Sequence, residues 1–121
     1  MDISVVNFKE KARKIMELHK YKIIAQMNDY QFKLVKARRE FIWHKHPETD
    51  EMFMVIEGVL HIELRNKTIV LHEGEMVVIP KGTEHKPVCK DVVCCLLIEP
   101  AGTVNTGNAG GALTDSDVEW I

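Results

Sequence analysis

The chain has 121 residues and a mass of 13.9 kDa, the size of a single domain. Its formal net charge is −2 and its pI is near 6.3, so no basic excess is available to neutralise phosphates. We therefore expect neither nucleic acid nor a membrane surface as a partner. With 45% hydrophobic and 28% charged residues, the composition excludes a disordered or fibrous chain.

The sequence predicts one domain made of three consecutive segments. Residues 1–20 hold an N-terminal helix and its lead-in, residues 21–100 hold the strands, and residues 101–121 form a glycine-rich tail. The helix is expected over residues 7–18, with Asn7 as its N-cap. Its apolar face comprises Phe8, Ala12, Ile15 and Met16. The tail ends in the apolar run Val118-Glu119-Trp120-Ile121, which favours docking over a frayed terminus.

Short runs of β-branched, aromatic and aliphatic residues, separated by turn residues, predict the strands. The expected ranges are 22–27, 30–38, 40–46, 51–57, 59–64, 68–72, 76–79, 85–88 and 92–99. So many short strands beside one helix indicate an all-β fold, an antiparallel barrel or sandwich. Residues 52–56 and 92–98 are apolar on both faces, so both faces of these strands need a cover. We expect a partner subunit to supply the second cover, and hence a homodimer.

Cys89, Cys94 and Cys95 form no CxxC pair and leave an odd thiol. Free thiols suit a reducing compartment, and the sequence shows neither a signal-peptide pattern nor a membrane-spanning apolar run. We therefore expect a cytoplasmic protein.

Two histidines with strand spacing point to a metal site. Side chains at positions i and i+2 of a strand share a face, so His44 and His46 would present two imidazoles together. Pro47 ends that strand, and Glu51 begins the next one, which would return a carboxylate beside them. Two histidines and one carboxylate can hold a divalent metal and leave coordination positions free. His85, after the turn through Pro80 to Gly82, is a fourth candidate.

These residues fit two motifs of the cupin superfamily, which the chain resembles. The first, His-x-His-(x4)-Glu-(x6)-Gly, matches His44, His46, Glu51 and Gly58, and the second, Gly-(x5)-Pro-x-Gly-(x2)-His, matches Gly74, Pro80, Gly82 and His85. The resemblance implies an antiparallel β-barrel of the jelly-roll type with one divalent metal ion held by His44, His46, Glu51 and His85. The stretch 98–107 also looks like the small cupins labelled mannose-6-phosphate isomerase-like.

Four ligands on a six-coordinate metal leave two open positions, which would let a small ligand chelate through two oxygens. We expect a small polar metabolite, sugar-like or a carbonyl compound, undergoing an isomerase or lyase-type reaction. One alternative is an Fe(II)-dependent dioxygenase, and another is a non-catalytic module that binds a metal and a small molecule. The ligand types leave Fe, Mn, Ni and Zn open as the metal, and no catalytic residue is assigned.

The parity of the ligand strand suggests further contacts. If no bulge intervenes, Lys36 and Arg38 share the face of His44 and could bind an anionic group of the substrate. Phe41 and Trp43 have the opposite parity and are expected outside the barrel, whereas Phe53 and Val55 should fill its interior.

Overall fold

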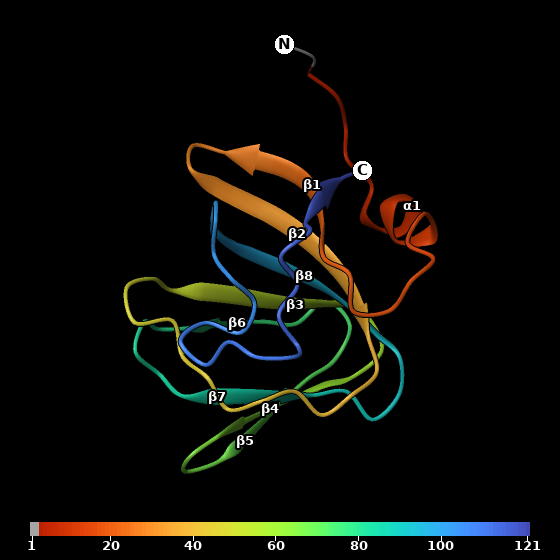
Figure 1. Cartoon of the computed structure of the whole chain (residues 1–121). Coiled ribbons are helices and arrows are strands. Elements are labelled where there is room, and N and C mark those ends of the chain that lie inside the picture. The colour runs from red at the N-terminus through yellow and green to blue at the C-terminus, as the bar shows by residue number, and fades with distance from the viewer. Residues whose placement is uncertain (1–2) are drawn as a thin grey trace.

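Nine strands and one helix form within residues 3–121, the part of the chain that the computed structural model describes. The elements are α1 (Phe8–Arg13), β1 (Lys22–Met27), β2 (Tyr30–Ala37), β3 (Glu51–Glu57), β4 (Leu60–Leu64), β5 (Thr68–Leu71), β6 (Met76–Ile79), β7 (His85–Val88), β8 (Val93–Pro100) and β9 (Glu119–Trp120). They build two sheets, ordered β6-β3-β8-β2-β1-β9 and β5-β4-β7. All pairings are antiparallel except the short one between β1 and β9. The all-β jelly-roll fold is confirmed (Figure 1).

The main core lies between the two sheets. Inward side chains of the large sheet, such as Val35, Val55 and Leu97, meet Leu60 and Ile62 of the small sheet, and all five are buried. Phe53 and Val55 fill this interior, as expected from their spacing. Burial of such aliphatic side chains supplies most of the driving force for packing the sheets together.

A second core covers the outer face of the large sheet. Ala12 and Ile15, in and just after α1, pack with Leu34 and Leu96 from the sheet, and Ile121 lies against them (Figure 1). The chain itself therefore covers part of the face that we expected a partner to cover.

None of the helices in residues 3–121 has the length and apolar character needed to cross a membrane.

The helix is shorter than predicted. The Asn7 side chain accepts a hydrogen bond from the Glu10 backbone N–H, which confirms the N-cap, but α1 ends at Arg13 with Lys14 as its C-cap. Ile15 is still buried beyond the helix end, whereas Met16 is 89% exposed and so does not belong to the packed face.

Residues 40–46 do not form the predicted strand. They make two isolated antiparallel bridges, Glu40 with Val88 and His44 with His85. Three residues lie between Glu40 and His44 but only two between His85 and Val88, so the stretch 41–43 contains one extra residue. An extra residue of this kind works as a bulge and reverses the direction of every later side chain.

The C-terminal segment docks on the barrel and crosses one end of it (Figure 1). β9 pairs in parallel with β1, and the Ile121 N–H donates to the Ile23 carbonyl over 3.0 Å. The Asp115 carboxylate accepts from the Tyr21 backbone N–H at 2.9 Å. This segment therefore follows the docking interpretation of the sequence.

Candidate metal centre

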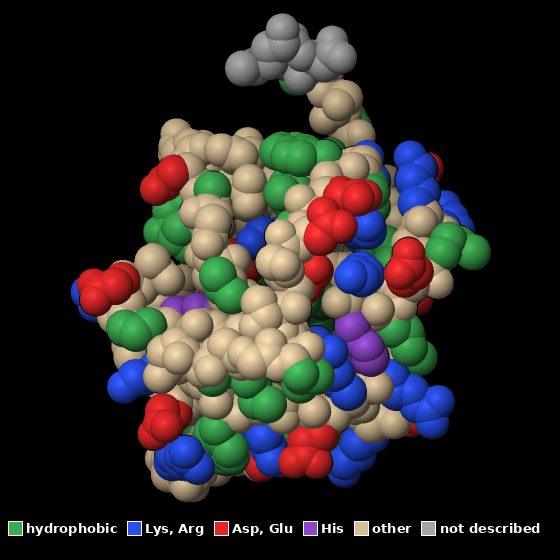
Figure 2. All heavy atoms as spheres, in the orientation of Figure 1, with side chains coloured by type: hydrophobic (Ala, Val, Ile, Leu, Met, Phe, Trp, Pro, Cys, Tyr) green, Lys and Arg blue, Asp and Glu red, His purple; other side chains and the backbone are tan. Residues whose placement is uncertain are grey.

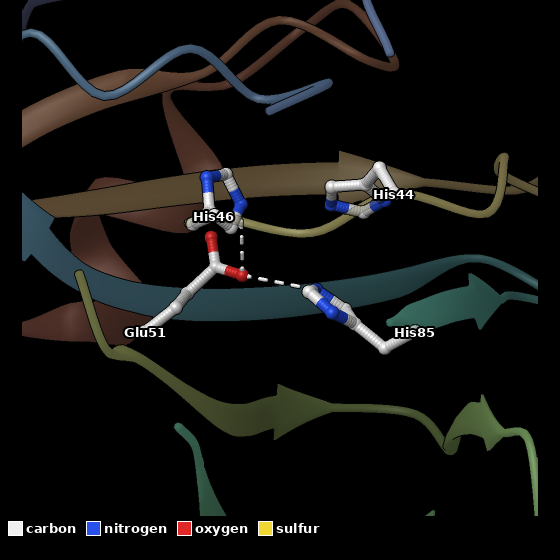
Figure 3. Close-up of side chains that lie close together, drawn as sticks. All are labelled: His44, His46, Glu51 and His85. Carbon is white, nitrogen blue, oxygen red and sulfur yellow. Dashed lines mark hydrogen bonds and ion pairs between the residues drawn. The ribbon is translucent and has the colours of Figure 1, made fainter. Parts of the chain in front are cut away.

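Four side chains from three parts of the chain converge inside the barrel (Figure 3). His44, His46, Glu51 and His85 each offer a ligand atom, and these atoms lie within 4.8 Å of one another. Their exposed fractions are 4%, 7%, 3% and 0%, respectively. Glu51 Oε1 lies 3.4 Å from His46 Nε2 and 3.3 Å from His85 Nε2. The cluster predicted from spacing is thus assembled and buried.

Backbone hydrogen bonds fix the orientation of His44 and His85. The two residues exchange backbone N–H to carbonyl bonds of 3.1 and 2.9 Å, which hold their rings side by side at 4.3 Å between centroids. His44 Nδ1 donates to the Ile42 carbonyl at 3.0 Å, and His85 Nδ1 donates to the Thr83 carbonyl at 2.9 Å. Because the proton of each ring then resides on Nδ1, Nε2 keeps a lone pair for a metal.

The turn before His85 is tied to the other ligands. The Gly82 N–H donates to the His46 carbonyl at 2.9 Å, and the Lys81 N–H donates to the Asp50 carboxylate at 2.8 Å. A proline two residues before Gly82, with Gly82 in a left-handed conformation at φ 78°, closes this turn tightly. The turn thereby couples the position of His85 to the strand start that carries Glu51.

The electrostatics of the cluster favour its metal-binding protonation states. Burial lowers the pKa of His44 to about 4, and the neighbouring rings of His85 and His46 act in the same direction. Burial alone would raise the pKa of Glu51, but the neighbouring imidazoles of His46 and His85 outweigh it and lower that pKa below its usual range. At neutral pH the cluster therefore offers neutral His44 and an anionic carboxylate, the forms that coordinate a metal.

One buried nitrogen in the cluster lacks a hydrogen-bond partner. His46 Nε2 is inaccessible to solvent, and its nearest polar neighbour is the carboxylate oxygen of Glu51. A buried polar atom without a partner is costly, and a metal ion between these donors would satisfy it. Three imidazoles and one carboxylate are also the donor types that first-row divalent metals accept. The residues present therefore fit a divalent metal ion.

A buried charged layer lies next to Glu51. Lys33 Nζ donates to Glu99 Oε1 at 3.1 Å and also reaches the Thr103 carbonyl at 3.4 Å. Lys33 is 3% exposed and Glu99 1%. Burial and then the negative charge of Glu51 raise the pKa of Glu99 well above its ordinary value. This layer links a proposed ligand to the C-terminal segment.

The comparisons with known proteins identify the family. A family model described as the cupin domain matches residues 31–99, more than half of the chain. The chain belongs to the cupin family. Its resemblance to the small cupins is thereby confirmed, and both motifs lie within the matched residues.

Several known proteins are similar to this chain. An uncharacterized protein of Bacillus subtilis, YdbB, is 40% identical over 76 residues, which cover 62% of this chain and 67% of that protein. The solved structure of a cupin-2 domain containing protein from Shewanella frigidimarina is 51% identical, with a TM-score of 0.77, and covers 79% of this chain and 94% of its own. A solved protein of Neisseria meningitidis is 29% identical with a TM-score of 0.73, covering 81% of this chain and 100% of its own.

The C-terminal segment of this cupin closes the mouth of the barrel over the cluster. Lys45 donates its backbone N–H to Asn108 Oδ1 at 2.9 Å, and the Asn108 N–H donates to the Lys45 carbonyl at 3.1 Å. The side chain of Asn105 accepts from the Asp115 N–H at 2.8 Å and donates to the Leu113 carbonyl at 2.9 Å. We call residues 101–118 the C-terminal cover.

Two spaces adjoin the cluster. An internal cavity of about 40 Å³ is lined by Tyr21, Arg39, Phe41 and Phe53 among others. The rings of Phe41 and Phe53 meet His44 and His85 edge-on at 5.2 and 6.0 Å between centroids. A surface hollow of about 320 Å³ lies between His46 and the start of the C-terminal cover. The hollow gives a ligand an approach to His46.

The structure does not bring Lys36 or Arg38 to the cluster. Lys36 Nζ donates to the Ile15 carbonyl at 3.2 Å, on the helix side of the large sheet, and Arg38 is exposed. The expected parity was wrong because the extra residue in 41–43 reverses it. The inward positions before this bulge are Lys33, Val35, Ala37, Arg39 and Phe41.

Phe41 is therefore inside rather than outside, and its neighbour Arg39 places its guanidinium 4.9 Å from the Phe41 ring. Trp43 stacks with Arg65, whose guanidinium lies 3.8 Å from the ring.

Sequence reasoning also missed Lys33 and Glu99. Their signal was present, because apolar residues flank each charge: Phe32 and Leu34 flank Lys33, and Ile98 and Pro100 flank Glu99.

Proposed function

We propose that this cupin holds one divalent metal ion through His44, His46, Glu51 and His85, and acts on a small polar metabolite. The observation that carries the proposal is the convergence of four buried ligand atoms within 4.8 Å, with His46 Nε2 lacking a partner. A metal held there would polarise a carbonyl or hydroxyl oxygen of a bound compound. The substrate class we favour is sugar-like or carbonyl compounds, in an isomerase or lyase-type reaction.

Residues around the cluster support a polar ligand. Burial, and then the charge of Glu51, raise the pKa of Tyr21, so its hydroxyl keeps a proton that it can donate. Arg39 places a permanent positive charge in the wall of the internal cavity, beside the Phe41 ring. Glu99, a buried carboxyl beside Glu51, is the candidate group for proton transfer.

The closed site favours a second candidate function. All four proposed ligands are at most 7% exposed, and the C-terminal cover lies across the barrel mouth. A non-catalytic module that only holds its metal would need no wider opening. An enzyme would have to admit its substrate by the hollow beside His46 or by movement of the cover.

We also propose a reducing, cytoplasmic compartment, which the three free thiols support.

Metal content measured by mass spectrometry tests the ligand assignment. Protein purified without added metal should carry close to one ion per chain, and His44→Ala, His46→Ala and Glu51→Ala should each lose it. His72→Ala is the matched control, because His72 is an exposed histidine outside the cluster. All variants should keep a β-rich circular dichroism spectrum. Full metal content in the three ligand variants would contradict the assignment.

The metal-loaded protein then separates the two functions. Sugar phosphates, keto acids and uronic acids are incubated with it, and binding is followed by thermal shift and conversion by NMR. Conversion that Glu51→Ala abolishes would support the enzyme. Binding without conversion across the set would favour the non-catalytic module.

A further inference from the structure

A buried carboxyl group on β8 faces the proposed ligand Glu51. Met52 of β3 pairs with Ile98 of β8 in an antiparallel register. Glu51, just before Met52, and Glu99, just after Ile98, therefore lie opposite each other, and their carboxyl groups are in contact. Both residues are at most 3% exposed. Glu99 Oε2 is buried and lacks a hydrogen-bond partner within residues 3–121, so this carboxyl group has an oxygen to spare.

Lys33 on β2 holds Glu99 from the other side. Lys33 pairs with Leu97 across the strands, which places it diagonal to Glu99, within reach of a long side chain. Its Nζ donates to Glu99 Oε1 at 3.1 Å and to the Thr103 carbonyl at 3.4 Å. The ammonium thereby joins Glu99 to the first residues of the C-terminal cover.

The segment that Lys33 holds separates two hollows. The hollow of about 320 Å³ beside His46, which we call the approach hollow, has residues 102–104 in its wall. A second hollow, of about 340 Å³, lies on the other side of the same residues and is lined by Gln31, Lys33 and Asp115 among others. We call residues 102–104 the shared wall. Figure 2 shows this face, with basic and acidic side chains deep between its tan segments and a histidine at a separate gap to the left.

Lys33 supplies the attachment of the shared wall to the barrel interior. The Thr103 N–H and hydroxyl donate to the Pro100 carbonyl, and the Val104 carbonyl accepts from the Gly107 N–H, so these bonds are local. In the described part of the chain, the remaining hydrogen bond of the shared wall is the one from Lys33. The position of this wall, and with it the width of the approach hollow, therefore depends on Lys33.

We propose that Glu99 and Lys33 are positioning residues for the metal centre. Glu99 limits the movement of the Glu51 carboxylate, and Lys33 holds Glu99 and the shared wall at the same time. Metal binding at Glu51 and the closed position of the shared wall then stabilise each other, because each fixes one end of the same series of contacts. The inference rests on the proposed metal site and adds the regulation of access to it.

A role in stability alone does not account for this layer. Burying two carboxyl groups and an ammonium costs free energy that apolar side chains of similar volume would not cost. Beside a metal ligand, however, outer hydrogen bonds orient the coordinating group. The cover also reaches the ligand stretch by a second route, the paired bonds of Asn108 with Lys45, which bypasses Glu51. Variants can therefore separate the two routes.

Titration of the metal-free full chain with Co²⁺ tests the positioning role, since the visible absorption of Co²⁺ reports both affinity and ligand arrangement. Lys33→Met should weaken binding about tenfold or more and change the spectrum. Glu99→Gln, whose amide can keep both contacts, should stay within about threefold of wild type. Lys36→Met is the matched control, because Lys36 also lies on β2 and donates to a backbone carbonyl, that of Ile15, on the outer face.

The outcomes separate this inference from the metal site on which it rests. Wild-type affinity and spectrum in Lys33→Met would overturn the positioning role and leave the metal site standing. Absence of Co²⁺ binding by the wild-type chain would overturn the metal site and the positioning role together.

Hydrogen exchange tests the coupling in the wild-type chain, without reliance on a variant that fails to fold. Loading with Co²⁺ should slow the amides of residues 101–105 about fivefold or more. The hydrogen-bonded turn 72–75, which contacts none of the four proposed ligands, should change little. Asn108→Ala should keep the metal-dependent slowing at 101–105, and Lys33→Met should remove it. Exchange at 101–105 that is independent of metal in the wild type would overturn the coupling.

Discussion

Lys33 Nζ lies 3.1 Å from Glu99 Oε1, and both side chains are almost completely buried beside Glu51. Two carboxyl groups and one ammonium share this interior, and the pKa of Glu99 is raised well above its ordinary value. Removing these three side chains from water costs so much free energy that the arrangement does not add net stability by itself. Loss of one side chain would nevertheless leave the other two buried without their partner. It also joins the proposed metal centre to the Thr103 carbonyl at the start of the C-terminal cover.

Lys33→Met should destabilise the fold by about 3 kcal/mol, because it leaves Glu99 and Glu51 without the only ammonium beside them among the described residues. Glu99→Gln should cost less than about 1 kcal/mol, since the amide can accept from Lys33 and donate toward Glu51. Urea unfolding of the metal-free protein measures both. Equal losses in the two variants would show that the charge of Lys33 is not what matters.

Gly107→Ala should dislodge the C-terminal cover. A Cβ atom at this position would lie 2.3 Å from the Lys45 carbonyl oxygen and 3.2 Å from the His44 ring, so backbone would have to move. Gly110→Ala is a close control, because Gly110 has a similar φ, 61° against 55°, and nothing within 4 Å of the added atom. We expect Gly107→Ala to lose about 2 kcal/mol more than the control. Similar unfolding midpoints would argue against a tight contact with the ligand segment.

Asn105→Ala should loosen the cover without touching the proposed ligands. Its amide satisfies the Leu113 carbonyl and the Asp115 N–H, and buried bonds of this kind are worth about 1–2 kcal/mol each. Hydrogen exchange at residues 105–115 should therefore speed up roughly tenfold or more. In metal-loaded protein, removal of the ion by a chelator should accelerate in parallel. Unchanged exchange would mean that other contacts hold the cover closed.

The metal-free protein should lose stability as the pH falls from 6.5 to 4.5. Burial lowers the pKa of His44 from 6.5 to about 4 in the folded chain, so the unfolded chain binds the extra proton in this window. Stability therefore falls with decreasing pH, by about 2–3 kcal/mol for this group. Glu51, with a lowered pKa, acts in the same direction below pH 4.5, while Glu99, with a raised pKa, acts in the opposite direction above it.

The difference between wild type and His44→Gln isolates the His44 contribution from the other titrating groups. Urea unfolding at pH 6.5 and 4.5 should show a shallower loss in the variant. Parallel pH dependences in the two proteins would mean that His44 is not held neutral by the fold.

The sequence by itself determined the site cluster and the fold class. The spacing of His44 and His46 and the return of the chain to Glu51 are local features, and the resemblance to the two cupin motifs added His85 to the set that the structure assembles. The short runs of β-branched, aromatic and aliphatic residues likewise located the strands, because eight of the nine expected ranges form strands and only 40–46 does not. These rules relate residues that lie close together in the sequence, so they can be applied without a structure.

Only the tertiary structure decided which charged residues face the site. One extra residue between Glu40 and His44 reverses the parity, so Arg39 and Phe41 face inward in place of Lys36 and Arg38. A bulge depends on pairing with a distant strand, here β7, and its position is not encoded in the local pattern. The meeting of Lys33 with Glu99, and of Gly107 with Lys45, likewise joins residues more than sixty positions apart. Such contacts follow from how the two sheets and the C-terminal cover pack together.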